Sequence, residues 1–252
     1  MLTTQRKQLI LSRLQREGQF VAKSFSEELG ISEDTVRRDL RELAAEGHLQ
    51  RVHGGALPSS AAVGDMQVRA QLAPEDKRLL GRAGAALVQP GQVVILDGGT
   101  TSLQVVQHLP LALRATVVTH SPTIAVALTG HPNIEVLMLG GRLFRHSMVN
   151  VGASVIEGAA RIRADLYLMG VTGVHAKAGL TTGDFEEAAV KRALHERAAE
   201  TVVLATLDKL GAASPFTVAA LKELAALVVP STIPAGLRKS LLASGVKVVR
   251  AE

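Results

Sequence analysis

Cysteine and tryptophan are absent from this 252-residue sequence, and other aromatic residues are few. Without cysteine the chain can form no disulfide bond and cannot bind zinc or an iron–sulfur cluster through thiolates. Proteins that bind single-stranded nucleic acid stack the bases on aromatic side chains, and one tyrosine and five phenylalanines are too few for that class. The lack of cysteine also suits a reducing compartment, and the predicted location is the cytoplasm.

Long apolar stretches are missing as well. The first ten residues contain no extended hydrophobic region of the kind found in signal peptides. Elsewhere glycine, arginine, aspartate or proline interrupts every apolar run before it reaches the length of a transmembrane helix. We therefore expect neither a signal peptide nor a membrane span, and no membrane partner.

The formal net charge is +5, which favours anionic partners. The excess is not concentrated at the N-terminus, because residues 1–58 carry nine Lys and Arg against eight Asp and Glu, a net of +1. An argument for nucleic-acid binding must therefore depend on where the arginines lie.

The N-terminal part of the chain predicts three short helices and a small β-element. Apolar residues recur at helical spacing over residues 4–17, and a second helix is predicted at 22–29. Gly30 can adopt the left-handed conformation that ends this second helix. Ser32 can cap a third helix, which continues to about residue 46. Residues 48–55 follow as a short strand and a glycine turn.

The third predicted helix has two opposite faces. Leu40 lies at the centre of an apolar stripe, while Arg37, Arg38 and Arg41 form a contiguous basic face. A recognition helix needs this division, because one side packs on the preceding helices and the other enters the major groove of DNA. Arginine donates paired hydrogen bonds to guanine or phosphate there. Spacing alone leaves an arginine-rich solvated face as the alternative.

These segments resemble the helix-turn-helix signature of the DeoR family of bacterial regulators. The resemblance covers most of residues 6–57 and rests on TVRRDL at 35–40, EGHL at 46–49 and RVHGGA at 51–56. It implies a winged helix-turn-helix that binds double-stranded operator DNA. The residues assigned to DNA contact are Ser32, Thr35, Arg37, Arg38, Arg41, Arg51 and His53. Asp39 is instead predicted to pair with a neighbouring arginine in a structural role.

The remainder of the chain predicts an α/β domain. Residues 58–74 are predicted as a linker, and Pro74 is placed where a helix begins. Beyond Pro90, short β-branched runs alternate with helical stretches, which predicts a mostly parallel sheet covered by helices on both faces. The predicted strands are 93–96, 115–119, 134–139, 166–169, 201–205, 226–229 and 246–249.

A glycine-rich loop follows the first of these strands and opens a helix. Its residues are Asp97, Gly98, Gly99, Thr100, Thr101 and Ser102. Glycines let a ligand approach the backbone, and amides and hydroxyls at a helix N-terminus can bind a phosphate. The loop is neither a Walker A motif nor a dinucleotide-binding motif, so no nucleotide cofactor is predicted. A purely structural strand-to-helix turn is the alternative.

Polar residues at other strand ends should meet this loop, because ligands bind beyond the carboxyl ends of parallel strands. The candidates at strand ends are His120, Ser121, Gly141, Arg145 and Lys209. His120 and Arg145 can equally be solvated or capping residues. Asp184, Glu187 and Lys191 share one helix face and predict either ligands for sugar hydroxyls or an exposed salt-bridge ladder.

The order of these motifs across residues 75–250 resembles the DeoR-family effector domain. This resemblance implies a fold similar to that of ribose-5-phosphate isomerases and coenzyme A transferases, and a phosphorylated sugar as effector. It assigns ligand contacts to residues 97–102, Asp184, Glu187, Lys191 and Lys209. His120 stands where the family commonly has asparagine, and Thr206 replaces its usual aspartate three positions before Lys209. These departures predict an altered ligand or a partly lost ligand site.

We therefore expect a winged helix-turn-helix domain at 1–57, a linker at 58–74 and an α/β effector domain at 75–252. The predicted function is transcriptional regulation, as a repressor of a sugar or carbon-metabolism operon under the control of a phosphorylated sugar or related anionic metabolite. The predicted partners are operator DNA, that metabolite and further copies of the chain in a dimer or tetramer. The alternative is a sugar-phosphate isomerase or transferase with a DNA-binding appendage. No metal or cofactor is predicted.

Overall fold

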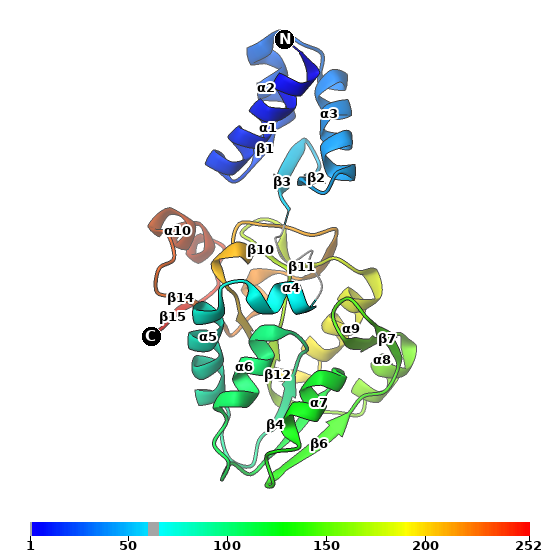
Figure 1. Ribbon diagram of the computed structural model, residues 1–252, viewed down its shortest axis with the longest axis vertical. Helices are drawn as coiled ribbons and strands as arrows, with labels where there is room; N and C mark the ends of the chain where they lie inside the picture. The colour runs from blue at the N-terminus through cyan, green and yellow to red at the C-terminus, as the bar shows by residue number, and fades with distance from the viewer. Residues whose placement is uncertain (1, 60–65) are drawn as a thin grey trace.

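The computed structural model describes residues 2–59 and 66–252 (Figure 1). Its N-terminal unit lies at one end of the long axis of the molecule. The elements of this unit are α1 (Thr3–Glu17), β1 (Phe20–Val21), α2 (Ala22–Leu29), α3 (Glu33–Ala45), β2 (Leu49–Val52) and β3 (Gly55–Pro58). The three strands form an antiparallel sheet in the order β1-β3-β2, the arrangement of a winged helix-turn-helix.

The ends of the N-terminal helices follow the predicted capping. Gly30 ends α2 in the left-handed conformation, with φ 61°. Ser32 caps α3, and its hydroxyl accepts a hydrogen bond from the Thr35 amide at 3.2 Å. Ile10, Phe25 and Leu40 then meet in a core that the three helices and the small sheet enclose.

Asp39 has the structural role that was predicted for it, but its partner is Arg6 of α1 and not an arginine close to it in sequence. The Arg6 side chain donates two hydrogen bonds to the two oxygens of the Asp39 carboxylate, one of them at 2.9 Å. Both side chains are buried. The partner lies 33 positions away along the chain, so the pair fixes α1 against the third helix.

The predicted linker contains regular structure at both ends. Strand β3 reaches Pro58, and a short helix, α4 (Met66–Gln71), precedes α5 (Pro74–Ala86). Residues 60–65 of the predicted linker lie outside the described residues. The Ala213 amide donates to the Pro58 carbonyl at 3.2 Å, so the end of β3 contacts the second unit directly.

The second unit is built on a seven-stranded sheet in the order β15-β14-β12-β9-β4-β5-β6. Every pairing within it is parallel. Its strands are β4 (Val93–Leu96), β5 (Ala115–Thr119), β6 (Ile134–Met138), β9 (Ala164–Met169), β12 (Ala198–Leu204), β14 (Ala226–Pro230) and β15 (Val248–Ala251). Each of the seven predicted runs therefore belongs to a strand of this sheet, although some strand ends differ by up to three residues.

Helices cover both faces of the sheet, as predicted (Figure 1). One face packs on α5, α6 (Thr100–His108) and α7 (Pro122–Leu128). The other packs on α8 (Ala153–Ala159), α9 (Phe185–His195) and α10 (Ala235–Ala243). Alternate strand residues face the two layers, so that the neighbours Leu168 and Met169 belong to different hydrophobic clusters.

The second unit also contains smaller elements that the sequence did not predict. A hairpin joins β7 (Arg142–Phe144) to β8 (Val149–Val151). A second antiparallel sheet contains β10 (Gly173–His175), β11 (Gly179–Thr182) and β13 (Phe216–Ala219). The 3-10 turns are η2 (Leu207–Lys209) and η3 (Leu221–Glu223). Within the described residues, no helix is long and apolar enough to span a membrane.

Candidate DNA-reading surface and effector pocket

The exposed face of α3 carries the three predicted arginines, but they have different surroundings. Arg37 forms an ion pair with Glu33 at 2.8 Å and lies 3.8 Å from the Asp34 carboxylate. Arg38 and Arg41 are exposed and form no ion pair or side-chain hydrogen bond within residues 2–59 and 66–252. Their donors are therefore available to an anionic partner without first breaking a contact.

The wing lies beside this helix. Arg51 of β2 and His53 of the β2–β3 turn are exposed, and they line a groove together with Arg37. At the start of α3 the Ser32 and Thr35 hydroxyls lie 3.0 Å apart, within hydrogen-bond distance. The seven residues assigned to DNA contact thus lie on α3, its cap and the wing.

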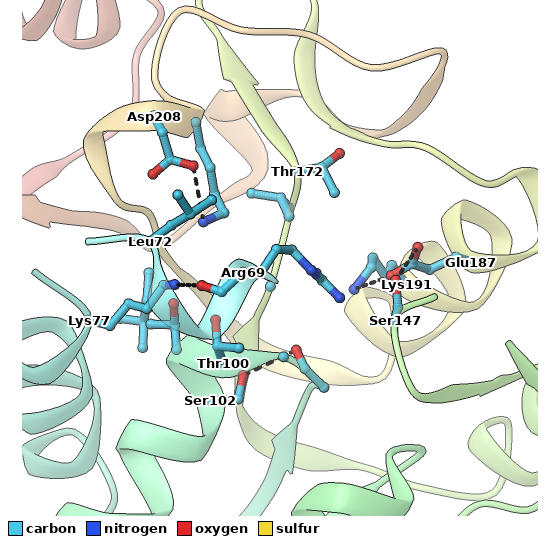
Figure 2. A pocket seen from close by; sticks show the side chains of 17 residues that line it. Arg69, Leu72, Lys77, Thr100, Ser102, Ser147, Thr172, Glu187, Lys191 and Asp208 are labelled. Carbon is cyan, nitrogen blue, oxygen red and sulfur yellow. Dashed lines mark hydrogen bonds and ion pairs between the residues drawn. The ribbon is translucent and has the colours of Figure 1, made fainter. Parts of the chain in front are cut away.

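The second unit contains a polar pocket at the carboxyl ends of its strands. Figure 2 shows side chains that come from α4, α5, α6, α9, the β7–β8 turn and η2 and surround one space. The lining residues are Arg69, Leu72, Lys77, Gly98, Gly99, Thr100, Thr101, Ser102, Ser147, Gly170, Val171, Thr172, Glu187, Lys191, Leu204, Asp208 and Lys209. The glycine-rich loop, Glu187, Lys191 and Lys209 are therefore brought together, as the sequence predicted.

The local structure explains why the loop has glycine at both positions 98 and 99. A Cβ at Gly98 would lie 2.4 Å from the Val149 side chain, so a larger residue would displace the β7–β8 hairpin. Gly99 has φ 116°, a conformation that L side chains rarely adopt. This backbone course places Thr100 and Thr101 at the first turn of α6, where helix amides are not used by the helix itself.

Asp97 lies beneath the pocket instead of lining it. Its buried carboxylate contacts the Lys191 ammonium at 2.5 Å and His120 Nε2 at 2.8 Å. It also accepts hydrogen bonds from the Tyr167 hydroxyl at 3.0 Å and the Gly170 amide at 2.9 Å. Although burial alone would raise the pKa of Asp97, Lys191 and His120 hold it well below its usual range. Asp97 therefore positions Lys191.

One end of the pocket is formed by α9 and the β7–β8 turn, and its charges compensate one another. The Glu187 carboxylate accepts hydrogen bonds from the Thr182 hydroxyl at 2.9 Å and the Ser147 hydroxyl at 3.3 Å. It also lies 3.4 Å from Lys191. Burial lowers the pKa of Lys191, but the nearby Asp97 and Glu187 carboxylates outweigh burial and raise it. Lys191 thus stays charged between two carboxylates.

The other end has an excess of positive charge. Lys77 and Lys209 face this end, with Asp208 as the nearby carboxylate, whereas the Arg69 guanidinium is directed toward the β7–β8 turn. Burial, and then the Lys209 ammonium, lower the pKa of Lys77 to about 8. Burial also lowers the pKa of Lys209, and Arg69 contributes in the same direction. Two ammonium groups with Asp208 as their nearby carboxylate, among the described residues, make this end a site for an anion.

The residue at position 206 contributes directly to this end. The Lys209 ammonium donates to the buried Thr206 hydroxyl at 2.8 Å and lies 3.8 Å from the Asp208 carboxylate. A neutral hydroxyl thus orients the lysine where an aspartate was expected from the resemblance. The hydroxyl does not neutralise the ammonium charge as an aspartate would, so that charge can act on a bound anion. One oxygen of Asp208, Oδ1, is buried without a hydrogen-bond partner in the described part of the chain.

Several predicted effector residues lie outside the pocket lining, and all of them except Arg145 have a structural contact there. His120 is buried below Asp97, and its Nδ1 meets the Asn150 carbonyl at 2.8 Å. The Ser121 hydroxyl donates to the Met148 carbonyl, and Gly141 packs closely on β8 and α8. Asp184 caps α9 by accepting a hydrogen bond from the Glu187 amide at 2.9 Å. Arg145 is exposed in the β7–β8 turn.

Sequence reasoning missed the contribution of the linker and the start of α5. Arg69 lies on α4, and Lys77 lies on the inward face of α5 in register with Leu80 and Gly84. A lysine on the buried stripe of a helix is the signal that could have identified it, because lysine is rarely buried without a functional or paired role. No comparable pattern marks Arg69, and Ser147 and Thr172 come from elements that were not predicted.

A winged helix-turn-helix with exposed arginines, joined to an α/β unit with a cationic pocket, is the architecture of a ligand-controlled DNA-binding protein. Residues 6–61 match the model of the DeoR-like helix-turn-helix domain, and residues 72–231 match that of the DeoR C-terminal sensor domain. The chain belongs to the DeoR family of transcriptional regulators.

Two relatives found by sequence agree with this assignment. The chain is 35% identical over 252 residues to the HTH-type transcriptional regulator GlpR of Haloferax volcanii, covering 99% of this chain and 98% of the relative. It is 33% identical over 221 residues to the HTH-type transcriptional repressor GlcR of Bacillus subtilis, covering 87% and 85%. Among solved structures, ribose 5-phosphate isomerase A from Methanocaldococcus jannaschii aligns with a TM-score of 0.40 and 18% identity, covering 54% of this chain and 55% of that chain.

Proposed function

We propose that this regulator represses a sugar or carbon-metabolism operon and that a phosphorylated sugar or related anionic metabolite in the pocket controls it. The observation that supports the effector class is the uneven charge of the pocket. Its cationic end faces the first turn of α6, where free amides and the Thr100 and Thr101 hydroxyls can bind a phosphate. At the other end, Glu187 can accept hydrogen bonds from sugar hydroxyls.

We propose the same division of labour that the sequence suggested. Residues 1–57 bind operator DNA through α3 and the wing, residues 58–74 connect, and residues 75–252 bind the effector. Operators for such readers are usually repeated half-sites, so a homodimer or tetramer in the cytoplasm is the expected working form. The GlcR relative is named a repressor, which supports repression over activation.

The direct test is a mobility-shift titration on the DNA upstream of the gene for this chain, with and without a panel of sugar phosphates. One sugar phosphate should change operator affinity by about 1–3 kcal/mol, a typical coupling between two sites. The Thr100→Ala/Thr101→Ala variant should bind the operator as the parent does but lose the response. Thr217→Ala, which removes an exposed threonine of β13, serves as the matched control. Equal effector responses in the parent and the loop variant would contradict the phosphate assignment.

The competing isomerase function can be tested with the same protein. Family membership favours regulation, and Lys191, which lines the pocket, is already paired with Asp97 beneath it. We therefore expect the purified protein to show no significant turnover of aldose phosphates to ketose phosphates or the reverse. Turnover by the parent protein that is lost in a Lys209→Ala variant would contradict this expectation and show that the protein is an enzyme.

A further inference from the structure

The segment that connects the two units forms one wall of the effector pocket. Arg69 of α4 reaches across the pocket in Figure 2, toward Lys191 and Ser147. Its guanidinium donates to the His146 carbonyl in the β7–β8 turn at 3.0 Å. Lys77, in the first turn of α5, donates to the Arg69 carbonyl and so holds the end of α4 against the pocket.

Lys77 is poorly compensated for a buried cation. Only 4% of the residue is exposed, and of its three N–H donors one meets the Arg69 carbonyl. Within residues 2–59 and 66–252, no carboxylate lies within ion-pair distance of its ammonium. The Lys209 ammonium repels it, and its lowered pKa agrees with this surplus of charge. A bound phosphate dianion would supply the missing counter-charge and accept the remaining hydrogen bonds.

Backbone strain occurs on both walls of the same pocket. Ala73, between α4 and α5, has φ 45°, and Met148, next to Ser147 in the β7–β8 turn, has φ 52°. These are the non-glycine residues with positive φ in the described part of the chain. Such conformations cost energy and persist where the surroundings impose them, often at ligand-binding sites.

We propose that Arg69 and Lys77 are direct ligands of the effector's phosphate, and that the bound phosphate therefore fixes connector helix α4 over the first turn of α6. This inference rests on the proposed function, namely that a phosphorylated metabolite occupies the pocket. The effector would then act on the chain segment that leads to the DNA-binding unit. Effector binding would shift the equilibrium between connector positions because it favours the one in which Arg69 and Lys77 face the phosphate.

The test is calorimetry on the full-length protein with two probes, inorganic phosphate and ribose 5-phosphate. Lys77→Met and Arg69→Met should each weaken binding of both probes at least tenfold. Arg78→Gln is the matched control, because it removes a positive charge from the exposed face of α5, one position along the chain. Its affinity should equal that of the parent. Lys77→Arg keeps the charge and should bind more tightly than Lys77→Met.

Hydrogen exchange of the α4 amides provides a second readout on the same samples. Phosphate should slow exchange at Met66–Gln71 in the parent and in Arg78→Gln, but not in Lys77→Met. Unchanged exchange in a parent protein that binds phosphate would overturn the connector inference, whatever the affinities are.

The outcomes separate this inference from the function on which it rests. If the parent binds a probe, the Thr100→Ala/Thr101→Ala variant does not, and both methionine variants bind as the parent does, the pocket is an effector site without connector ligands. If the parent binds neither probe, the proposed effector class fails, and this inference fails with it.

Discussion

The N-terminal unit and the cationic end of the effector pocket bury charge in opposite ways. In the N-terminal unit, the buried cation Arg6 is matched by Asp39, and the arginines available for DNA stay on the surface. At that end of the pocket, Lys77 and Lys209 are buried with Asp208 as their nearby carboxylate among the described residues. DNA is large enough to bind to arginines on an exposed surface, whereas a small anion binds in a pocket whose charged groups are buried. The sensing unit must therefore hold a costly arrangement of charge before its ligand arrives.

The largest predicted effect is the loss of stability when the buried Arg6–Asp39 pair is broken. Asp39→Ala leaves Arg6 buried without its counter-charge and should destabilise the N-terminal unit by about 3–5 kcal/mol. Hydrogen exchange of α1 amides in a urea series on the full chain measures this loss. Glu46→Ala breaks an exposed pair with Lys7 and should cost less than about 1 kcal/mol. A double variant, Arg6→Met/Asp39→Leu, should recover most of the stability. A loss for Asp39→Ala no larger than for Glu46→Ala would remove the contrast between the two units.

At the cationic end of the effector pocket, removal of a buried charge should have the opposite effect and increase stability. Lys77→Met replaces a poorly compensated ammonium with an apolar side chain of similar length, so the ligand-free protein should gain stability of the order of 1–3 kcal/mol at pH 7. Thermal melting without phosphate measures the gain. Lys239→Met, at an exposed position of α10, is the control and should change stability by less than about 0.5 kcal/mol.

The pH dependence of this gain follows from the direction of the pKa shift. The folded protein holds the pKa of Lys77 near 8, below its ordinary value of 10.5, with Lys209, Asp208 and Arg69 as the charged neighbours. The unfolded chain therefore binds the proton more tightly than the folded protein does. Below about pH 8 the buried Lys77 is charged, and its destabilising effect on the fold has its full size. Stability of the parent should recover as the pH rises from 8 toward 10.5, so the advantage of Lys77→Met should shrink over that range. A constant advantage would show that charge burial is not its cause.

On the DNA-reading surface, the comparison predicts a difference between neighbouring arginines. Arg38→Ala should weaken operator binding by about 1–3 kcal/mol, the range for loss of a base contact. Arg37→Ala should cost less, because Arg37 must first leave Glu33 and Asp34. Arg51→Ala should weaken binding to specific and non-specific DNA alike. It should also reduce the slope of log K against log salt concentration by about one, as loss of a phosphate contact does. Mobility shifts at several salt concentrations test all three, and unchanged affinity in an Arg37→Ala/Arg38→Ala variant would remove α3 as the recognition helix.

The sequence predicted elements well where a pattern is local. Strands β4 and β5 begin and end where their β-branched runs do, and Gly30 and Ser32 mark the helix ends on either side of the turn. The β7–β8 hairpin was missed because three-residue strands show too little periodicity to be recognised. These short strands depend on contacts across the fold, such as the packing of Val149 on Gly98.

The candidate site divides in the same way. The loop at 98–102 is contiguous in sequence and was found, whereas Arg69 enters from a segment that was predicted as a linker. The direction of a side chain at a strand end is also not a local property. Asp97 follows β4 directly, yet its carboxylate turns beneath the pocket because Lys191, His120 and Gly170 meet it there. Proximity was predictable in these cases, but orientation depended on the tertiary contacts.

The smallest predicted effect concerns Asp184, which the sequence assigned to the effector. In the structure its carboxylate caps α9 by accepting a hydrogen bond from the Glu187 amide. Asp184→Ala should therefore destabilise the sensing unit by about 1 kcal/mol, as loss of a helix cap does, and should change ribose 5-phosphate affinity by less than about threefold. Asp184→Ser keeps a hydroxyl that can cap the helix and should restore most of the stability. Melting and calorimetry on the two variants separate the roles, because only a direct ligand would lose affinity in both. If Asp184→Ser melts like the parent but binds ribose 5-phosphate tenfold more weakly, Asp184 contacts the effector, and the α9 end of the pocket carries a second carboxylate ligand beside Glu187.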